Sequence, residues 1–249
     1  MEEKIANIIL STAKLPGYKI HPYETYARLK IFGIFDIEHP KDLYKADIQM
    51  LTEAAKSFAG KHSIKLGATG FATGLPGGPW GMAAGVTADL EEYLRRVFRI
   101  AQEIGHVYGL IPMPFVDSVN EDVDEYYSAA QKEILEAILI GVGLGGVSMG
   151  IAETAKRIAK KEAEGILSKK ISDRLIAQLA NRITRILGGN LTQEQISMRA
   201  LKFIPVLGGV INGFFCYKSI EIVGNNLINN FEKAHNSVRE NVIKYWQNK

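Results

Sequence analysis

Apolar residues recur at spacings of three and four along most of the chain, a pattern that predicts amphipathic helices. The predicted helices cover residues 40–59, 87–108, 118–138, 162–187 and 208–246. Pro40 suits the first turn of a helix, and Gly109 followed by Pro112 ends the second one. Residues 18–37 show no helical stripe, so we expect a short strand pair or an irregular aromatic arm there. The pattern predicts one all-α domain over residues 1–249, a multi-helix bundle with an N-terminal helix and arm over 1–40 and a helical core over 41–249.

A charge-free run over residues 66–88 contains seven glycines and two prolines between positions 67 and 85. It lacks the lysine and the preceding strand of a phosphate-binding loop, so we interpret it as two small-residue helical arms around a turn at residues 75–80. Glycines four residues apart let helix backbones approach closely, either in a tightly packed core or in a hairpin that meets a membrane. The glycines predicted to pack the central helices closely are Gly70, Gly74, Gly81, Gly85, Gly141, Gly145, Gly209 and Gly213.

Composition and charge narrow the class of protein. With 47% hydrophobic residues the chain can bury a sizeable core. Its 30 basic and 27 acidic residues give too small a net charge for a dedicated nucleic-acid binder, so we expect no nucleic-acid partner. The single Cys216 and the acidic start without a signal peptide predict a cytoplasmic protein.

Basic residues gather at positions 156–185, where nine Lys and Arg stand against three acidic residues. An amphipathic helix of this kind can lie on an anionic bilayer, and the alternative is an ordinary solvated face. The residues predicted to contact a membrane or partner are Leu75, Pro76, Gly77, Gly78, Pro79, Trp80, Lys156, Arg157, Lys160, Lys161, Lys169 and Lys170.

Two Glu-x-x-His pairs, Glu103 with His106 and Glu232 with His235, resemble the pairs that di-iron helix bundles use as ligands. Glu103 and His106 continue a polar stripe opposite the apolar face of their helix, so we expect them to face water or to form ordinary salt bridges. We therefore predict no catalytic residue, no metal and no cofactor. A metal-dependent enzyme using these four residues stays as an alternative, as does a soluble carrier with an apolar internal cavity.

Three blocks of the chain, taken in order, resemble the EcsC protein family, which is named for a bacterial protein encoded beside an ABC exporter. They are "ATGFATGLPGGPWGMAAGVTADL", "RIAQEIGHVYG" and "KFIPVLGGVINGFFCYKSIEIVG", and together they span about residues 67–224. The resemblance implies a helical, membrane-associated accessory protein without catalytic residues. It implies an anionic membrane surface, or a membrane protein such as an ABC exporter, as the partner. We therefore expect a non-catalytic protein that is peripheral to the membrane and binds lipid or an exporter.

Overall fold

The computed structural model describes residues 18, 20–74, 79–110, 134, 137–143, 177, 181 and 205–247. At positions 69–74, 79–91, 205–216, 241 and 245–247 it describes the helix backbone only. The elements in this part of the chain are helical and include no strand, which confirms the all-α prediction.

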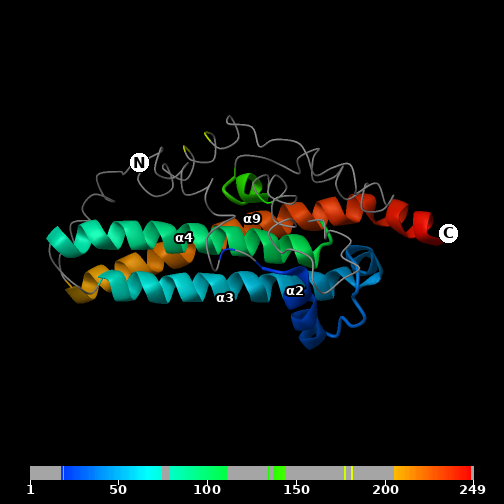
Figure 1. Cartoon of the computed structure of the whole chain (residues 1–249), viewed down its shortest axis with the longest axis horizontal. Helices are drawn as coiled ribbons and strands as arrows, with labels where there is room; N and C mark the ends of the chain where they lie inside the picture. Colours follow the sequence, from blue (N-terminus) through cyan, green and yellow to red (C-terminus); the bar gives the residue numbers. More distant parts are fainter. Residues whose placement is uncertain are drawn as a thin grey trace, which may run out of the picture.

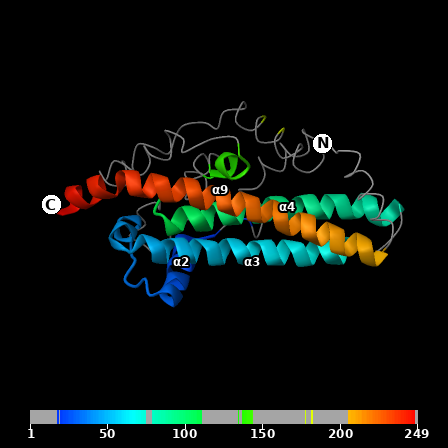
Figure 2. The ribbon, with the colours of Figure 1, turned by 180° about the vertical axis from the view of Figure 1, so that it is seen from behind.

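Three long helices form the frame of the molecule: α3 (Ile48–Gly74), α4 (Pro79–Val107) and α9 (Pro205–Gln247). Each packs against the other two, and α3 and α4 run antiparallel (Figures 1 and 2). With 43 residues, α9 is about 65 Å long at a rise of about 1.5 Å per residue. It therefore runs beside the other two helices over much of their length (Figure 2).

The predicted apolar stripes of the three helices meet in one core. Fully buried members include Leu51, Phe58, Leu94, Ile104, Leu227 and Phe231. Gly224 lies at the closest approach, since a Cβ built there would stand 2.8 Å from the Ala59 Cβ on α3. The α9 backbone thus rests almost directly on α3 at this point.

The ends of the helices follow local signals. Gly109 has a φ of 64°, and the Leu110 amide bonds back to the Gly105 carbonyl at 2.9 Å, so the predicted stop after α4 is confirmed. The predicted single helix over residues 40–59 is wrong at its start. A 3-10 helix, η3 (Pro40–Lys45), comes first, and α3 begins at Ile48 after an extended Ala46. The Asp47 side chain accepts from the Gln49 amide at 2.7 Å, as a helix cap does.

The stretch at residues 18–37 contains a short helix, α2 (Pro22–Leu29), followed by the 3-10 turn η2 (Lys30–Phe32). The strand pair considered from the sequence is therefore wrong for the described residues. Thr25, Tyr26 and Leu29 do form a buried helical stripe, but the hydroxyls of its first two members hid it from an apolar pattern. Residues 34–38 then run without helix toward η3.

Of the other predicted helices, 208–246 falls within α9, and 87–108 falls within α4 except for its last residue. The predicted helices over 118–138 and 162–187 lie almost entirely outside the described residues. Across the helices that are described, no stretch combines the length and the hydropathy that crossing a bilayer takes.

Candidate functional site

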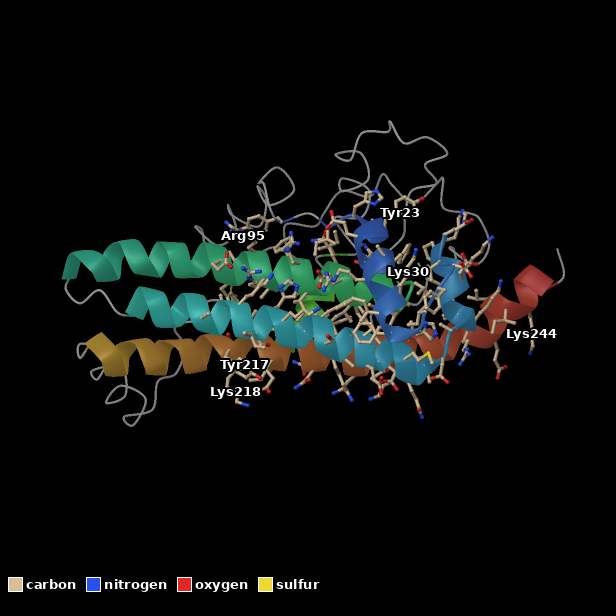
Figure 3. All side chains as sticks on the ribbon, turned by 90° about the horizontal axis from the view of Figure 1, so that it is seen from below. Tyr23, Lys30, Arg95, Tyr217, Lys218 and Lys244 are labelled. Atoms are coloured by element: carbon tan, nitrogen blue, oxygen red, sulfur yellow. The ribbon has the colours of Figure 1, made fainter. Side chains whose placement is uncertain are left out.

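A cavity of about 380 Å³ lies between α2, α3 and α4. Eight of the described residues line it, and six of these are Lys or Arg while one is acidic. The lining residues are Arg28, Lys61, His62, Lys65, Arg95, Arg96, Arg99 and Glu103. In Figure 3, Tyr23 and Lys30 mark α2, and Arg95 marks the part of α4 that contributes to the cavity. Positive charge therefore predominates around this cavity.

Helical spacing explains why these side chains meet. Lys61 and Lys65 are four residues apart on α3, as are Arg95 and Arg99 on α4, so each pair lies on one helix face. Gln102 ties the chain before α2 to α4, because its amide oxygen accepts from the Ile20 amide at 3.1 Å and its amide nitrogen donates to the Tyr18 carbonyl at 2.8 Å. This attachment holds α2 against α4 beside the cavity.

Glu103 is the buried centre of the cavity wall, with 2% of its side chain exposed. Arg28 Nη1 donates to one carboxylate oxygen at 2.6 Å, and His62 Nε2 lies 3.0 Å from the other. Burial alone raises the pKa of Glu103, but the hydrogen bond and charge of His62, together with the Arg28 guanidinium, outweigh it and bring the pKa below its ordinary value. The carboxylate is therefore ionised and joins α2, α3 and α4.

His62 is held in one orientation by this contact. An ionised carboxylate only accepts hydrogen bonds, so Nε2 of the imidazole is the donor. The His62 side chain is 7% exposed, and its Nδ1 is buried without a hydrogen-bond partner in the described part of the chain. An unpaired buried polar atom costs free energy, so a hydrogen-bond partner at this nitrogen would stabilise the protein.

The arginines of the wall are also fixed in place. Glu92 pairs with both Arg95, at 3.0 Å, and Arg96. The guanidinium of Arg28 lies 4.0 Å from the centre of the Phe58 ring, a favourable cation–π distance. These contacts orient the cations before any ligand arrives. The arrangement suits an anion with several oxygen acceptors, because guanidinium groups match phosphate geometry.

The expectation that Glu103 and His106 face water or form salt bridges is confirmed for the salt bridge of Glu103 with Arg28. A water-facing position is wrong for both residues, since both are buried. His106 is fully buried, and its Nδ1 lies 3.3 Å from the Thr25 hydroxyl of α2. Burial lowers the pKa of His106 to about 3, so the imidazole is neutral. The physical reason for this burial is that α2 and α3 pack against the part of α4 that carries Glu103 and His106.

The side chains of the second Glu-x-x-His pair also bond to other groups of the protein. His235 is buried, stacks on Tyr44 with ring centres 4.5 Å apart, and has its Nδ1 2.9 Å from the Tyr108 carbonyl. Burial lowers its pKa to about 4. Glu232 accepts from the Thr52 hydroxyl at 3.2 Å. Within the described residues no group of three potential ligands comes together.

The structure describes only some of the residues predicted to contact a membrane or partner. Residues 75–78 and the basic positions between 156 and 170 lie outside the described residues. Pro79 and Trp80 begin α4, and their side chains are among those not described. Residues 75–78 of the turn predicted at 75–80 thus fall between the end of α3 and the start of α4, whereas its last two residues belong to α4.

The glycines predicted to pack closely fall on several helices. Gly70 and Gly74 are on α3, Gly81 and Gly85 on α4, and Gly209 and Gly213 on α9, while Gly145 is not described. At Gly141 a Cβ would stand 2.9 Å from the Val223 side chain of α9. The Gly141 carbonyl also accepts from the Asn226 side chain at 2.9 Å, which ties this short segment to α9.

The sequence pattern predicted the polar stripe of α4. It did not predict that basic residues of α2 and α3 share a cavity with this stripe. A usable signal was present: Lys61 and Lys65 form a basic i, i+4 pair on the helix just before the glycine-rich run, and Arg95 and Arg99 form another on the helix after it. If those two helices form a hairpin, the basic pairs can share one groove. Arg28 gave no such signal, since α2 itself was not recognised.

Fold and site together define a class: an all-helical protein with a cation-lined cavity between three helices. Comparison of the chain with protein-family models, curated proteins and solved structures gives no match. The resemblance to the EcsC family therefore stays a prediction from the sequence.

Proposed function

We propose that this protein is a non-catalytic accessory protein that attaches to the membrane surface by binding anionic lipid headgroups in the cavity between α2, α3 and α4. The observation that carries the proposal is the cavity lining, with six Lys or Arg side chains around one space. Each well-placed Lys or Arg near an anionic bilayer contributes about 1 kcal/mol. Several cations in one cavity therefore support attachment without a membrane-spanning helix.

An exposed apolar patch near Arg28 favours a lipid surface over a purely soluble ligand. Ile31 and Phe35, on either side of Gly33, leave 77% and 60% of their side chains exposed. The partly exposed Met50 reaches the same place, with its Cε 3.9 Å from the position of a Cβ on Gly33. Single exposed apolar residues are common, but a group on the segment that follows Arg28 fits the interface, where headgroups and acyl chains meet.

The glycine-rich turn at residues 75–80 and the basic positions from 156 to 170 are part of the proposal as further contacts. We propose a cytoplasmic location at the membrane surface, and an ABC exporter as one partner that the EcsC resemblance suggests. These further contacts, the location and the exporter partner are inferred from the sequence. Headgroup binding in the cavity is inferred from the geometry of the cavity lining.

The described structure gives less support to the two alternatives. A metal-dependent enzyme would bring Glu103, His106, Glu232 and His235 together, yet each bonds to a different protein group in the described region. A carrier of apolar ligands needs an apolar lining, whereas the cavity described above is lined by charged side chains.

Vesicle flotation tests the proposal directly. The protein should float with vesicles containing 30 mol% phosphatidylglycerol and stay behind with pure phosphatidylcholine vesicles. Adding 0.5 M NaCl should weaken the binding, because salt shortens the reach of electrostatic attraction. Absence of binding to both kinds of vesicle at low salt would contradict the proposal.

A further inference from the structure

We infer that the cavity selects a phosphomonoester, a phosphate joined to its carrier through a single oxygen, and that His62 Nδ1 contacts one of its terminal oxygens. A phosphomonoester carried by a lipid is one of the anionic headgroups of the proposed function. For a lipid ligand, the inference therefore rests on the proposed function. The chemistry itself is shared by lipid and soluble phosphomonoesters.

The positive charge of the cavity lining favours a phosphomonoester. The described lining holds six Lys or Arg side chains and one carboxylate, which is already bonded to Arg28 and His62. Glu92, which is not among the lining residues, pairs with Arg95 and Arg96. A phosphodiester carries one negative charge, whereas a phosphomonoester carries about −1.5 to −2 at pH 7 because its second pKa is about 6. The more highly charged group compensates more of the positive charge in the cavity and offers three terminal oxygens instead of two.

The hydrogen bonding of His62 also favours a phosphomonoester. Its Nε2 donates to Glu103, and among the described residues Nδ1 has no hydrogen-bond partner. Nδ1 donates when the imidazole is charged and accepts when it is neutral. A phosphomonoester satisfies both states, since its oxygens accept and its protonated form has a P–OH that donates. A phosphodiester has acceptor oxygens only and satisfies the charged imidazole alone.

Size and access agree with this chemistry. A volume of about 380 Å³ is within the range of about 300–1,000 Å³ that is typical of small-molecule sites. Arg28 and Arg95, at the wall of the cavity, leave 33% and 40% of their side chains exposed, so the cavity is open to solvent. A phosphate can enter while its carrier, soluble or anchored in a bilayer, extends outward.

Calorimetric titration of the full-length chain with soluble probes tests the selectivity. We expect glycerol 3-phosphate to bind at least tenfold more tightly than dimethyl phosphate at equal ionic strength. His62→Gln should remove most of this preference, and His39→Gln, a histidine that does not line the cavity, should retain it. Unfolding midpoints of both variants confirm that they are folded. Equal binding of the two probes by the unaltered protein, or an unchanged preference in a folded His62→Gln variant, would overturn the inference.

Vesicles distinguish the sources of the phosphomonoester. Vesicles containing phosphatidic acid should bind more tightly than phosphatidylglycerol vesicles matched in surface potential, which supports a lipid source. Preference for glycerol 3-phosphate without binding to any anionic vesicle supports the inference with a soluble source and contradicts the proposed function. Equal binding to both matched vesicles, with no preference among soluble probes, overturns the inference and leaves the proposed function in place.

Discussion

His62 on α3 and Glu103 on α4 form a buried contact, with 3.0 Å between Nε2 and the carboxylate oxygen. Arg28 of α2 bonds to the other oxygen of the same carboxylate at 2.6 Å. One buried side chain thus holds three helices together and forms part of the cavity wall. The shape of the cavity and the stability of the bundle therefore depend on the same residue.

Replacing Glu103 with Gln should destabilise the protein. The change keeps the shape of the side chain but leaves the Arg28 and His62 contacts without their negative partner, and we expect the free energy of unfolding to fall by about 1–3 kcal/mol. Urea denaturation followed by circular dichroism measures the loss. Glu221→Gln, which breaks the solvent-exposed pair with Lys218, is the control and should leave the urea midpoint unchanged. Equal midpoints for the two variants would contradict the account.

Stability should fall as the pH drops from 8 to 5. Burial lowers the pKa of His106 to about 3 and of His235 to about 4, compared with about 6.5 in the unfolded chain. The unfolded state then binds more protons than the folded state below about pH 6.5, so acid favours unfolding, at a cost of about 2 kcal/mol per histidine at pH 5. Denaturation at both pH values should show a smaller difference for His106→Asn than for the unaltered protein. An identical pH dependence in the two proteins would argue against a buried neutral His106.

The contact between α9 and α3 can be tested with two glycines. Gly224→Ala places a Cβ 2.8 Å from the Ala59 Cβ, so we expect a loss of about 1–3 kcal/mol in the free energy of unfolding. Gly60 on α3 has no atom within 4 Å of the position its Cβ would take, so Gly60→Ala should stabilise the protein by about 0.5–1 kcal/mol. Thermal unfolding of both variants should give midpoint shifts of opposite sign. Stabilisation by both substitutions would show that α9 does not approach α3 this closely.

The apolar patch around Gly33 predicts a role for Ile31 in membrane binding. Ile31→Ser should weaken flotation with phosphatidylglycerol vesicles about fivefold, because roughly 1 kcal/mol of apolar burial in the interface is lost. Its effect on folding should be negligible, since the side chain is largely exposed. Ile222→Ser on α9, also at an exposed isoleucine, is the matched control and should bind as the unaltered protein does. Equal effects of the two substitutions would remove the patch from the proposal.

The sequence was sufficient for the long helices because their apolar stripes are regular and their ends carry local signals such as Gly109. It was insufficient for the site because the site depends on which helices meet. Glu103 looked solvent-facing on an isolated helix, and only the packing of α2 and α3 against α4 buries it. Contacts such as Gly224 on Ala59 join distant parts of the chain, and no local pattern marks that pairing.

The central claim, that the cavity itself binds the anionic ligand, is tested most directly by comparing two lysine pairs in vesicle flotation. Lys61→Gln with Lys65→Gln removes two cations from the cavity lining. Lys45→Gln with Lys244→Gln removes two lysines that are each 72% exposed and lie outside it. Both double variants lower the net charge equally. The account predicts at least tenfold weaker binding to phosphatidylglycerol vesicles for the cavity variant, at about 1 kcal/mol per lysine lost, and less than threefold for the control. Equal weakening of the two would mean that general surface charge, and not the cavity, holds the protein on the membrane.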